Sequence, residues 1–132
     1  MLILLPLLIG LASMATPPAA STIRFQFDYE EVKSKVSGLN TTAMQALMTE
    51  AAAYISKYTK TYPKAFTIPP STTCNGVAIA SNISATYSDI DLLVIVSAES
   101  NMIYQSIGEV CYYDTGFINR PALGKLTFSS EL

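Results

Sequence analysis

Histidine and tryptophan are absent from this 132-residue sequence, and only 14% of its residues are charged. Without an imidazole, the chain can hold neither a His-Glu-x-x-His zinc motif nor a serine or cysteine nucleophile that histidine activates. The formal net charge is −2, and no basic cluster of the kind that binds nucleic acid is present. The sequence therefore argues against a self-contained zinc peptidase, a histidine-dependent hydrolase and a nucleic-acid-binding protein.

The chain nevertheless has enough apolar residues to form a packed core. Half of its residues are hydrophobic, which is typical of a folded domain rather than of a disordered chain. A length of 132 residues fits one domain or part of one.

Residues 1–15 have the pattern of a secretory signal peptide. A leucine-rich run is followed by Ser13-Met14-Ala15, which places small residues at the two positions that signal peptidase recognises. A membrane anchor is the alternative, but a spanning helix takes about 20 apolar residues, and this run reaches Thr16 and Pro17-Pro18 first. We expect cleavage after Ala15, a flexible lead over residues 16–21, and a secreted or cell-surface protein.

Cys74 and Cys111 are the two cysteines of the chain. In a secreted protein an even number of cysteines favours a disulfide, although two buried thiols that never meet remain an alternative. Two thiols so far apart in the sequence make a poor zinc site. Asn40-Thr41-Thr42 and Asn82-Ile83-Ser84 match the acceptor pattern for N-glycosylation, which predicts glycans on Asn40 and Asn82 if the protein is secreted.

The hydrophobic patterns predict an α+β fold with a mixed, α/β-like sheet. Alternation over residues 22–29 predicts a half-buried strand. A strand is predicted over residues 90–96, where residues 92–96 are apolar without alternation, as expected of a strand covered on both faces. Further strands are predicted over residues 65–69, 76–80, 103–113 and 122–128.

One long helix is predicted over residues 42–60, after a polar connection at residues 33–40. Thr42-Ala43-Met44-Gln45 has the spacing of a capping box, and Pro63 bounds the helix. Apolar residues recur at intervals of three and four, which predicts core packing rather than a cofactor site. This stripe consists of Met44, Leu47, Met48, Ala51, Ile55 and Tyr58.

Residues 68–129 resemble the N-terminal half of the catalytic domain of leishmanolysin-type zinc metallopeptidases. The likeness depends on three markers around the strand that begins at Asp91. They are Cys74 after Ile68-Pro69-Pro70, Cys111 followed by Asp114, and Arg120-Pro121-x-x-Gly124. Members of this family are secreted or surface-anchored endopeptidases that act in proteolysis and cell adhesion.

The resemblance implies a zincin-type N-terminal subdomain over residues 22–132, incomplete because the active-site helix is missing. Full-length members of the family bind zinc, but we expect no catalytic residue, metal ligand or cofactor in this chain. Asp89 and Asp91 are expected to be solvated residues at the start of a strand, with a calcium site as the alternative.

The resemblance also implies a binding mode. In such peptidases an edge strand pairs with extended substrate through backbone hydrogen bonds. The candidate residues are Ile103, Gln105, Ile107 and Glu109, and an ordinary strand without this role is the alternative. A sheet covered on both faces needs two layers, so we expect a missing C-terminal part or a partner to cover it.

Three hypotheses about function follow. The chain is the N-terminal part of a secreted leishmanolysin-like endopeptidase, inactive alone and able to bind peptide or protein substrate only once completed. Alternatively, it is a non-catalytic secreted binding or adhesion protein derived from such a peptidase. The third hypothesis is an unrelated secreted α+β module whose markers coincide by chance.

Overall fold

The computed structural model describes residues 19–116 and 119–130. The predicted signal peptide at residues 1–15 and the first part of the predicted lead, residues 16–18, lie outside the described residues.

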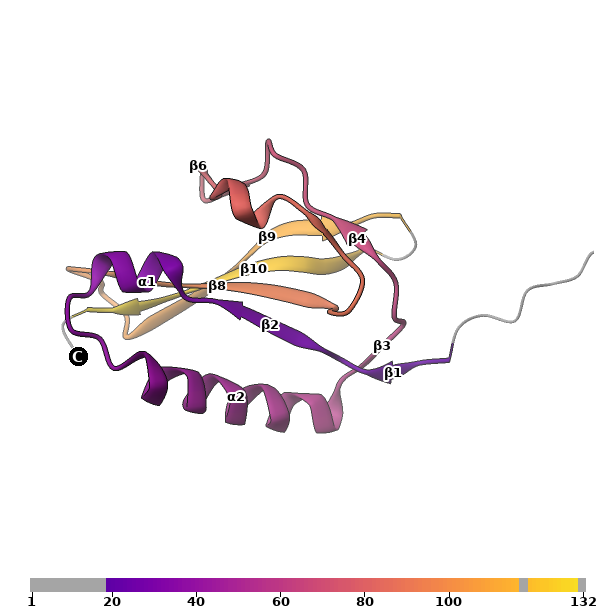
Figure 1. Ribbon diagram of the computed structural model, residues 1–132, viewed down its shortest axis with the longest axis horizontal. Helices are drawn as coiled ribbons and strands as arrows, with labels where there is room; N and C mark the ends of the chain where they lie inside the picture. Colours follow the sequence, from indigo (N-terminus) through magenta and orange to yellow (C-terminus); the bar gives the residue numbers. More distant parts are fainter. Residues whose placement is uncertain (1–18, 117–118, 131–132) are drawn as a thin grey trace, which may run out of the picture.

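A mixed four-stranded sheet forms the centre of the molecule (Figure 1). Its strands lie in the order β2 (Phe25–Asp28), β8 (Leu92–Glu99), β10 (Arg120–Ser129) and β9 (Ser106–Asp114). β2, β8 and β10 are parallel, and β9 pairs antiparallel with β10 at one edge of the sheet. The predicted α+β class with a mixed sheet is therefore confirmed.

The strand predicted over residues 22–29 is split in two. β1 (Ser21–Thr22) pairs with β3 (Lys60–Thr61), and only β2 joins the main sheet. Between them, the backbone N–H of Arg24 donates to the carboxylate of Asp91 at 2.9 Å. Because this N–H binds a side chain instead of a neighbouring strand, the ladder is interrupted here.

Both faces of β8 contribute buried residues, as predicted, although Leu92 and Val94 are only half-buried. Leu93 and Ile95 belong to one core cluster, and Val96 and Ala98 belong to another. Successive side chains of a strand point to opposite faces. We call the side of Leu93 the disulfide face and the side of Val96 the helix face.

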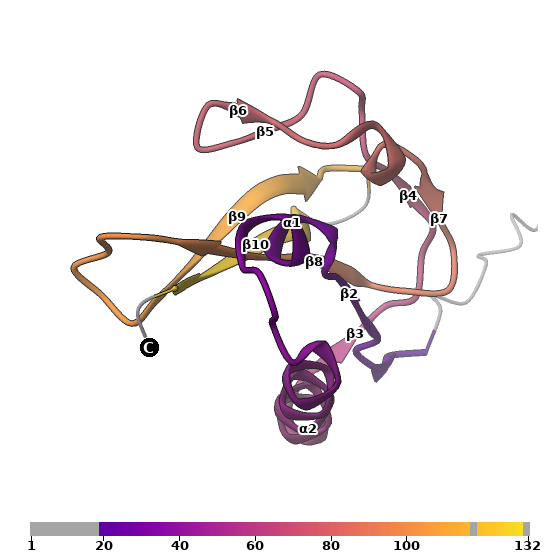
Figure 2. The ribbon, with the colours of Figure 1, turned by 60° about the vertical axis from the view of Figure 1, so that its left-hand side comes forward.

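Residues 66–87 cover the disulfide face with little regular structure. The segment contains the pair β4 (Phe66–Thr67) and β7 (Thr86–Tyr87), the pair β5 (Thr73–Cys74) and β6 (Val77–Ala78), and the 3-10 turn η1 (Ser81–Ile83). Phe66, Ile68 and Ile83 are buried in the same cluster as Leu93. Figure 2 shows this segment and the long helix α2 on opposite sides of the sheet.

The predicted disulfide between Cys74 and Cys111 is confirmed. It joins β5 to β9, with 4.8 Å between the two Cα atoms, so the alternative of two separate thiols is wrong. The bond attaches the covering segment directly to the edge strand of the sheet.

A short helix, α1 (Glu30–Lys35), occupies part of what was predicted to be a polar connection at residues 33–40. Its sequence is charged, but Val32 is fully buried against the helix face. Pairs three and four residues apart support it, with Lys33 at 2.8 Å from Glu30 and Lys35 at 2.9 Å from Glu31.

The long helix, α2 (Thr41–Tyr58), differs from its prediction at both the cap and the buried face. Asn40 rather than Thr42 is the N-cap, and its Oδ1 accepts from the Ala43 N–H at 3.0 Å. Met48 is the buried residue of the helix, whereas Leu47 and Ile55 are 62% and 45% exposed. The prediction that the whole stripe packs into the core is therefore wrong, because this side of α2 overlooks an uncovered part of the sheet.

Candidate binding surface

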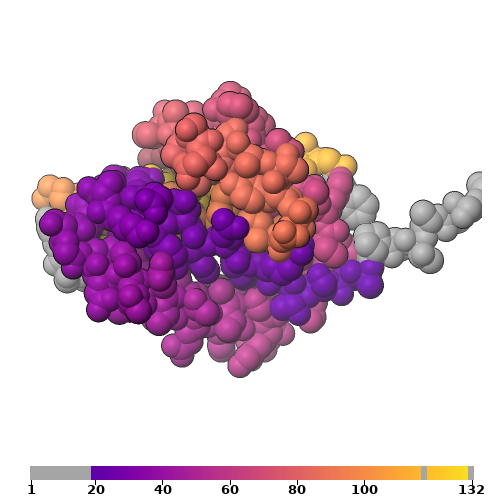
Figure 3. All heavy atoms as spheres, in the orientation of Figure 1, coloured from indigo at the N-terminus to yellow at the C-terminus, as the bar shows by residue number. Residues whose placement is uncertain are grey.

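An apolar groove lies between α2 and the helix face of the sheet. Its volume is about 690 Å³, and Figure 3 shows a narrow hollow between α2 and β2. Ser106, Glu109 and Lys125 are its polar lining residues, and the others are apolar or glycine. They are Phe25, Phe27, Leu47, Met48, Ala51, Ala52, Ile55, Leu92, Val94, Gly108, Val110, Pro121, Gly124, Leu126 and Phe128.

The groove lies where the sheet is uncovered. The sequence predicted that one whole layer is missing, yet the face opposite α2 is covered by residues 66–87. The open area lies instead beside α2, over β9 and β10. Gly108 and Gly124 lie on its floor, so the backbone is accessible there without side chains in the way.

β9 is an edge strand, and it contains two of the four residues predicted to pair with a substrate. Ile107 and Glu109 lie in β9 opposite Thr127 and Lys125 of β10. Ile103 lies in the preceding loop and is 93% exposed. Gln105 directly precedes the strand, where its carbonyl accepts from the Ser129 N–H at 2.9 Å. The four residues thus do not form one strand face.

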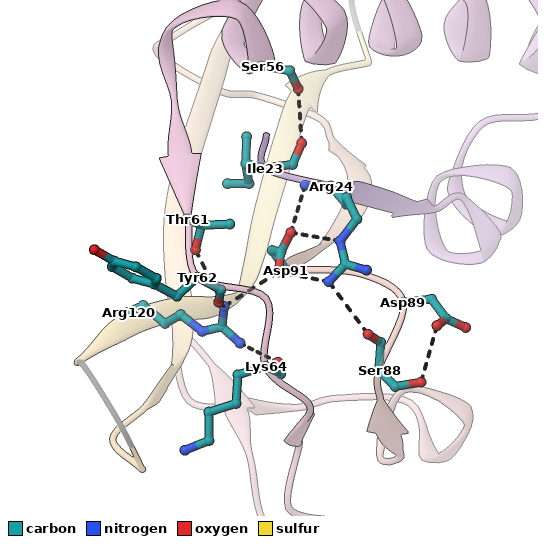
Figure 4. A network of polar contacts seen from close by, with 10 residues as sticks. All are labelled: Ile23, Arg24, Ser56, Thr61, Tyr62, Lys64, Ser88, Asp89, Asp91 and Arg120. Atoms are coloured by element: carbon teal, nitrogen blue, oxygen red, sulfur yellow. Dashed lines mark hydrogen bonds and ion pairs between the residues drawn. The ribbon is translucent and has the colours of Figure 1, made fainter. Parts of the chain in front are cut away.

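Asp91 is buried and paired with arginines, which corrects the expectation that it is a solvated residue. It is 2% exposed, and its Oδ2 accepts from the Arg24 Nε at 3.0 Å while Arg120 Nη1 lies 3.5 Å from its Oδ1 (Figure 4). Burial alone would raise the pKa of Asp91, but the hydrogen bonds from Arg24 and the two guanidinium charges hold it below its usual value. Because two cations already neutralise it, Asp91 is not a calcium ligand; Asp89 is exposed.

Arg120, from the Arg-Pro marker, is a structural tie. Its guanidinium donates to the carbonyl oxygens of Tyr62 at 3.0 Å and Lys64 at 2.6 Å. Its Nε lies 3.7 Å from Asp114, the acidic residue of the Cys-x-x-Asp marker, and it sits 5.7 Å from the Phe66 ring centroid. Asp91, Asp114 and Arg120 are therefore brought together, as scaffolding rather than as a reactive site.

A second polar cluster surrounds Glu31. Its carboxylate accepts from Lys125 and from the Ser97 hydroxyl, both at 2.8 Å, and pairs with Lys35 at 2.9 Å. Burial would raise the pKa of Glu31, but these hydrogen bonds and charges lower it to about 2. Ser97 also accepts from Lys35 at 3.1 Å, which places a serine beside a lysine.

This serine and lysine do not form a nucleophile and its base. Ser97 is fully buried, so no substrate carbonyl can reach its Oγ. The Lys35 ammonium is paired with Glu31 and donates to the Ser97 hydroxyl, so it is placed as a donor and not as a base.

The described residues do not fit a zinc site. No group of three or more His, Cys, Asp or Glu side chains in residues 19–116 and 119–130 is placed to hold a metal ion. The chain contains no histidine, and both cysteines are in the disulfide.

No helix within residues 19–116 and 119–130 is long and apolar enough to span a membrane.

Asn40 and Asn82, the predicted glycosylation sites, are both exposed. Asn40 caps α2 through its Oδ1, which leaves its Nδ2 available for a glycan. Asn82 lies in η1 beside the buried Ile83. Glycosylation at both positions stays a prediction.

Three features of this surface escaped the sequence reasoning. The Glu31 cluster joins residues that lie 94 positions apart in the case of Lys125. Arg24 has no sequence marker that links it to Asp91. The Asn75-Gly76 turn between β5 and β6, where both residues have positive φ, did have a signal, because Asn-Gly is a frequent two-residue hairpin loop.

Comparison of the chain with protein-family models, with curated proteins and with solved structures found no match.

Proposed function

We propose that this chain is the N-terminal part of a secreted or cell-surface leishmanolysin-like zinc metalloendopeptidase, without the zinc-binding motif itself. The observation that carries the proposal is the apolar groove on the helix face. A groove of about 690 Å³ beside a helix with exposed Leu47 and Ile55 has the character of an interface for another element. In a zincin-type subdomain that element is the active-site helix.

The shape of the groove suits a helix that runs beside α2. Helices pack with axes about 8–10 Å apart, and the α2 side of the groove consists of Leu47, Ala51 and Ile55, which share one helix face. Glycines on the sheet floor, Gly108 and Gly124, permit close approach. A helix placed there would cover the residues that the fold leaves exposed.

The sheet order gives further support. β9 is antiparallel in an otherwise parallel sheet and lies at the edge next to β10. The family markers also serve this arrangement, because Cys111 ties β9 to the covering segment and Arg120 ties β10 to residues 62–64. In this proposal the chain contributes the scaffold and the edge strand, and the zinc ligands belong to the segment that completes the domain.

The coding sequence provides the direct test. We expect the reading frame to continue past Leu132 into a His-Glu-x-x-His helix within a few tens of residues. The longer product should then cleave protein substrates in a chelator-sensitive manner, whereas the 132-residue chain should not. A genuine stop codon after Leu132, together with native material of that length, would exclude the fragment proposal.

A non-catalytic binding or adhesion protein derived from such a peptidase is the second candidate. It is favoured by the exposed edge of β9, where Ile107 is 45% exposed. Because Gln105 already accepts from Ser129 on β10, strand addition there would use the outward backbone groups of Ser106 and Gly108. The predicted residues Ile103, Gln105, Ile107 and Glu109 would then be neighbouring contacts. Hydrogen exchange of the β9 amides should slow when an extended peptide ligand is added, and unchanged exchange would argue against this candidate.

A further inference from the structure

Large apolar side chains on the exposed side of α2 lie in one row. Leu47, Tyr54 and Tyr58 are 62%, 63% and 75% exposed, and Ala51 is exposed between them. We call these four residues the outer row. Apart from the outer row and the neighbouring Ile55, the exposed residues of α2 are polar, charged or alanine. The large apolar side chains are therefore confined to one strip of the helix surface, as at a protein–protein contact.

The spacing within the outer row is that of a helix–helix contact. Its members follow one another at intervals of four, three and four residues, as the core positions of a heptad repeat do. Figure 1 shows α2 along the outside of the molecule, with one side toward the sheet and the other side open. Two members of the row, Tyr54 and Tyr58, are outside the lining of the apolar groove, so this surface extends beyond the groove.

A second copy of α2 in antiparallel orientation matches the sizes of these side chains. Because the two helices run in opposite directions, the first member of one row lies opposite the last member of the other. Leu47 then packs against Tyr58 of the second copy, and Ala51 packs against Tyr54, so each large ring meets a smaller side chain. A parallel pair would instead oppose Tyr54 to Tyr54 and Ala51 to Ala51, which crowds one layer and leaves a gap in the next.

Two charged residues beside the outer row favour the same orientation. Glu50 and Lys57 are seven residues apart, so they lie on one flank of the helix, and both are exposed. In an antiparallel pair this flank faces the same flank of the second helix, which brings Glu50 of each copy beside Lys57 of the other. In a parallel pair it would face the opposite flank, where Ile55 lies, and these ion pairs could not form.

We propose that the chain forms a two-fold dimer in which the outer rows of two antiparallel α2 helices pack together. Leu47 and two tyrosines of each copy leave water, and two ion pairs between Glu50 and Lys57 set the orientation. The contact is short because α2 has 18 residues, so the dimer is weak and exchanges with the monomer. This inference does not rest on the proposed function.

Sedimentation velocity of the purified chain, freed of glycans and with its disulfide intact, measures the association. We expect a concentration-dependent dimer. Tyr54→Lys places a charge against Ala51 of the second copy and should raise the dissociation constant at least about tenfold. Ala53→Lys adds the same charge at an exposed position of α2 outside the outer row, and should leave the dissociation constant within about twofold of the wild-type value.

A charge exchange tests the orientation of the two helices. Glu50→Lys or Lys57→Glu alone turns both ion pairs into like-charge contacts and should raise the dissociation constant about fivefold at low salt. The double variant Glu50→Lys, Lys57→Glu restores opposite charges and should return the dissociation constant to the wild-type value. Both residues are exposed, so circular dichroism should report an unchanged fold in each variant.

Three outcomes would overturn the proposal. They are a monomer at every concentration up to about 1 mM, equal effects of Tyr54→Lys and Ala53→Lys, and a double charge variant that associates no more tightly than the single variants. None of these outcomes bears on whether the reading frame continues into a zinc helix.

Discussion

The main-chain N–H and the guanidinium of Arg24 bind one carboxylate, that of Asp91, with N–O distances of 2.9, 3.0 and 3.1 Å. Asp91 begins the segment that leads into β8, and Arg24 precedes β2, so this contact aligns two parallel strands at their N-terminal ends. Arg120 reaches the same carboxylate from β10. One acidic side chain therefore links three neighbouring strands of the sheet.

Replacing Asp91 by asparagine should strongly destabilise the fold. Arg120 is almost fully buried, and removal of one partner from a buried ion pair costs about 3–5 kcal/mol. Urea unfolding followed by circular dichroism measures the loss. The matched control is Asp89→Asn, at an exposed position, which should change the free energy of unfolding by less than about 0.5 kcal/mol. Equal effects of the two substitutions would contradict the central role of Asp91.

Stability should fall in acid because of Glu31. Its folded-state pKa of about 2 lies below the ordinary value of 4.5, so its stabilising contribution is present above pH 4.5 and is lost as the pH falls toward 2. The contribution is no more than about 3 kcal/mol, and solvent screening reduces it. The difference in unfolding free energy between the wild type and Glu31→Gln should shrink over this pH window.

Glu50→Gln, at an exposed position on α2, is the control for this titration. Its unfolding free energy should follow the wild-type pH profile. A constant difference in unfolding free energy between the wild type and Glu31→Gln from pH 5 to pH 2 would contradict the prediction, because it would show that ionisation of Glu31 does not stabilise the fold.

The disulfide should account for a large share of the stability. It closes a loop with a sequence separation of 37, which is worth about 4 kcal/mol in the chain-entropy model. The double variant Cys74→Ser, Cys111→Ser should unfold at a correspondingly lower denaturant concentration. Adding a reductant should lower the midpoint of the wild type but not that of the variant. An unchanged wild-type midpoint under reducing conditions would contradict this expectation.

Asn40 has two separable roles, as a helix cap and as a predicted glycan acceptor. Asn40→Ala should cost about 0.5–2 kcal/mol by removing the N-cap of α2, in unglycosylated material. Thr42→Ala destroys the acceptor pattern but keeps the Asn40 cap, so it should lose the glycan in secreted material without the loss of stability. Equal destabilisation by both substitutions would show that the cap is not the cause.

The parts of the fold that follow from local pattern could be predicted, and the parts that depend on distant partners could not. The run over residues 90–96 identified β8 because continuous burial needs continuous apolar residues. α1 was not predicted because its sequence is mostly charged, and the burial of Val32 depends on tertiary packing. The burial of Asp91 was not predicted because its partner Arg24 lies 67 residues away in the sequence, and no local pattern connects the two residues.

The candidate surface was predicted in outline and corrected in position. An uncovered area of sheet was expected from the count of predicted helices, but the count could not show that residues 66–87 form a layer without helical structure. The edge position of β9 depends on the strand order, which hydrophobic periodicity alone does not determine. The Asn75-Gly76 turn, in contrast, was available from the sequence as a local signal.

The covalent bond between Cys74 and Cys111 has a mechanical consequence. If the molecule is stretched from its two ends, the bond transmits the force directly from β5 to β9. The residues between Cys74 and Cys111 are therefore not extended. A separation of 37 residues corresponds to about 125 Å of contour length. In a single-molecule pulling experiment this length should appear only after a reductant is added.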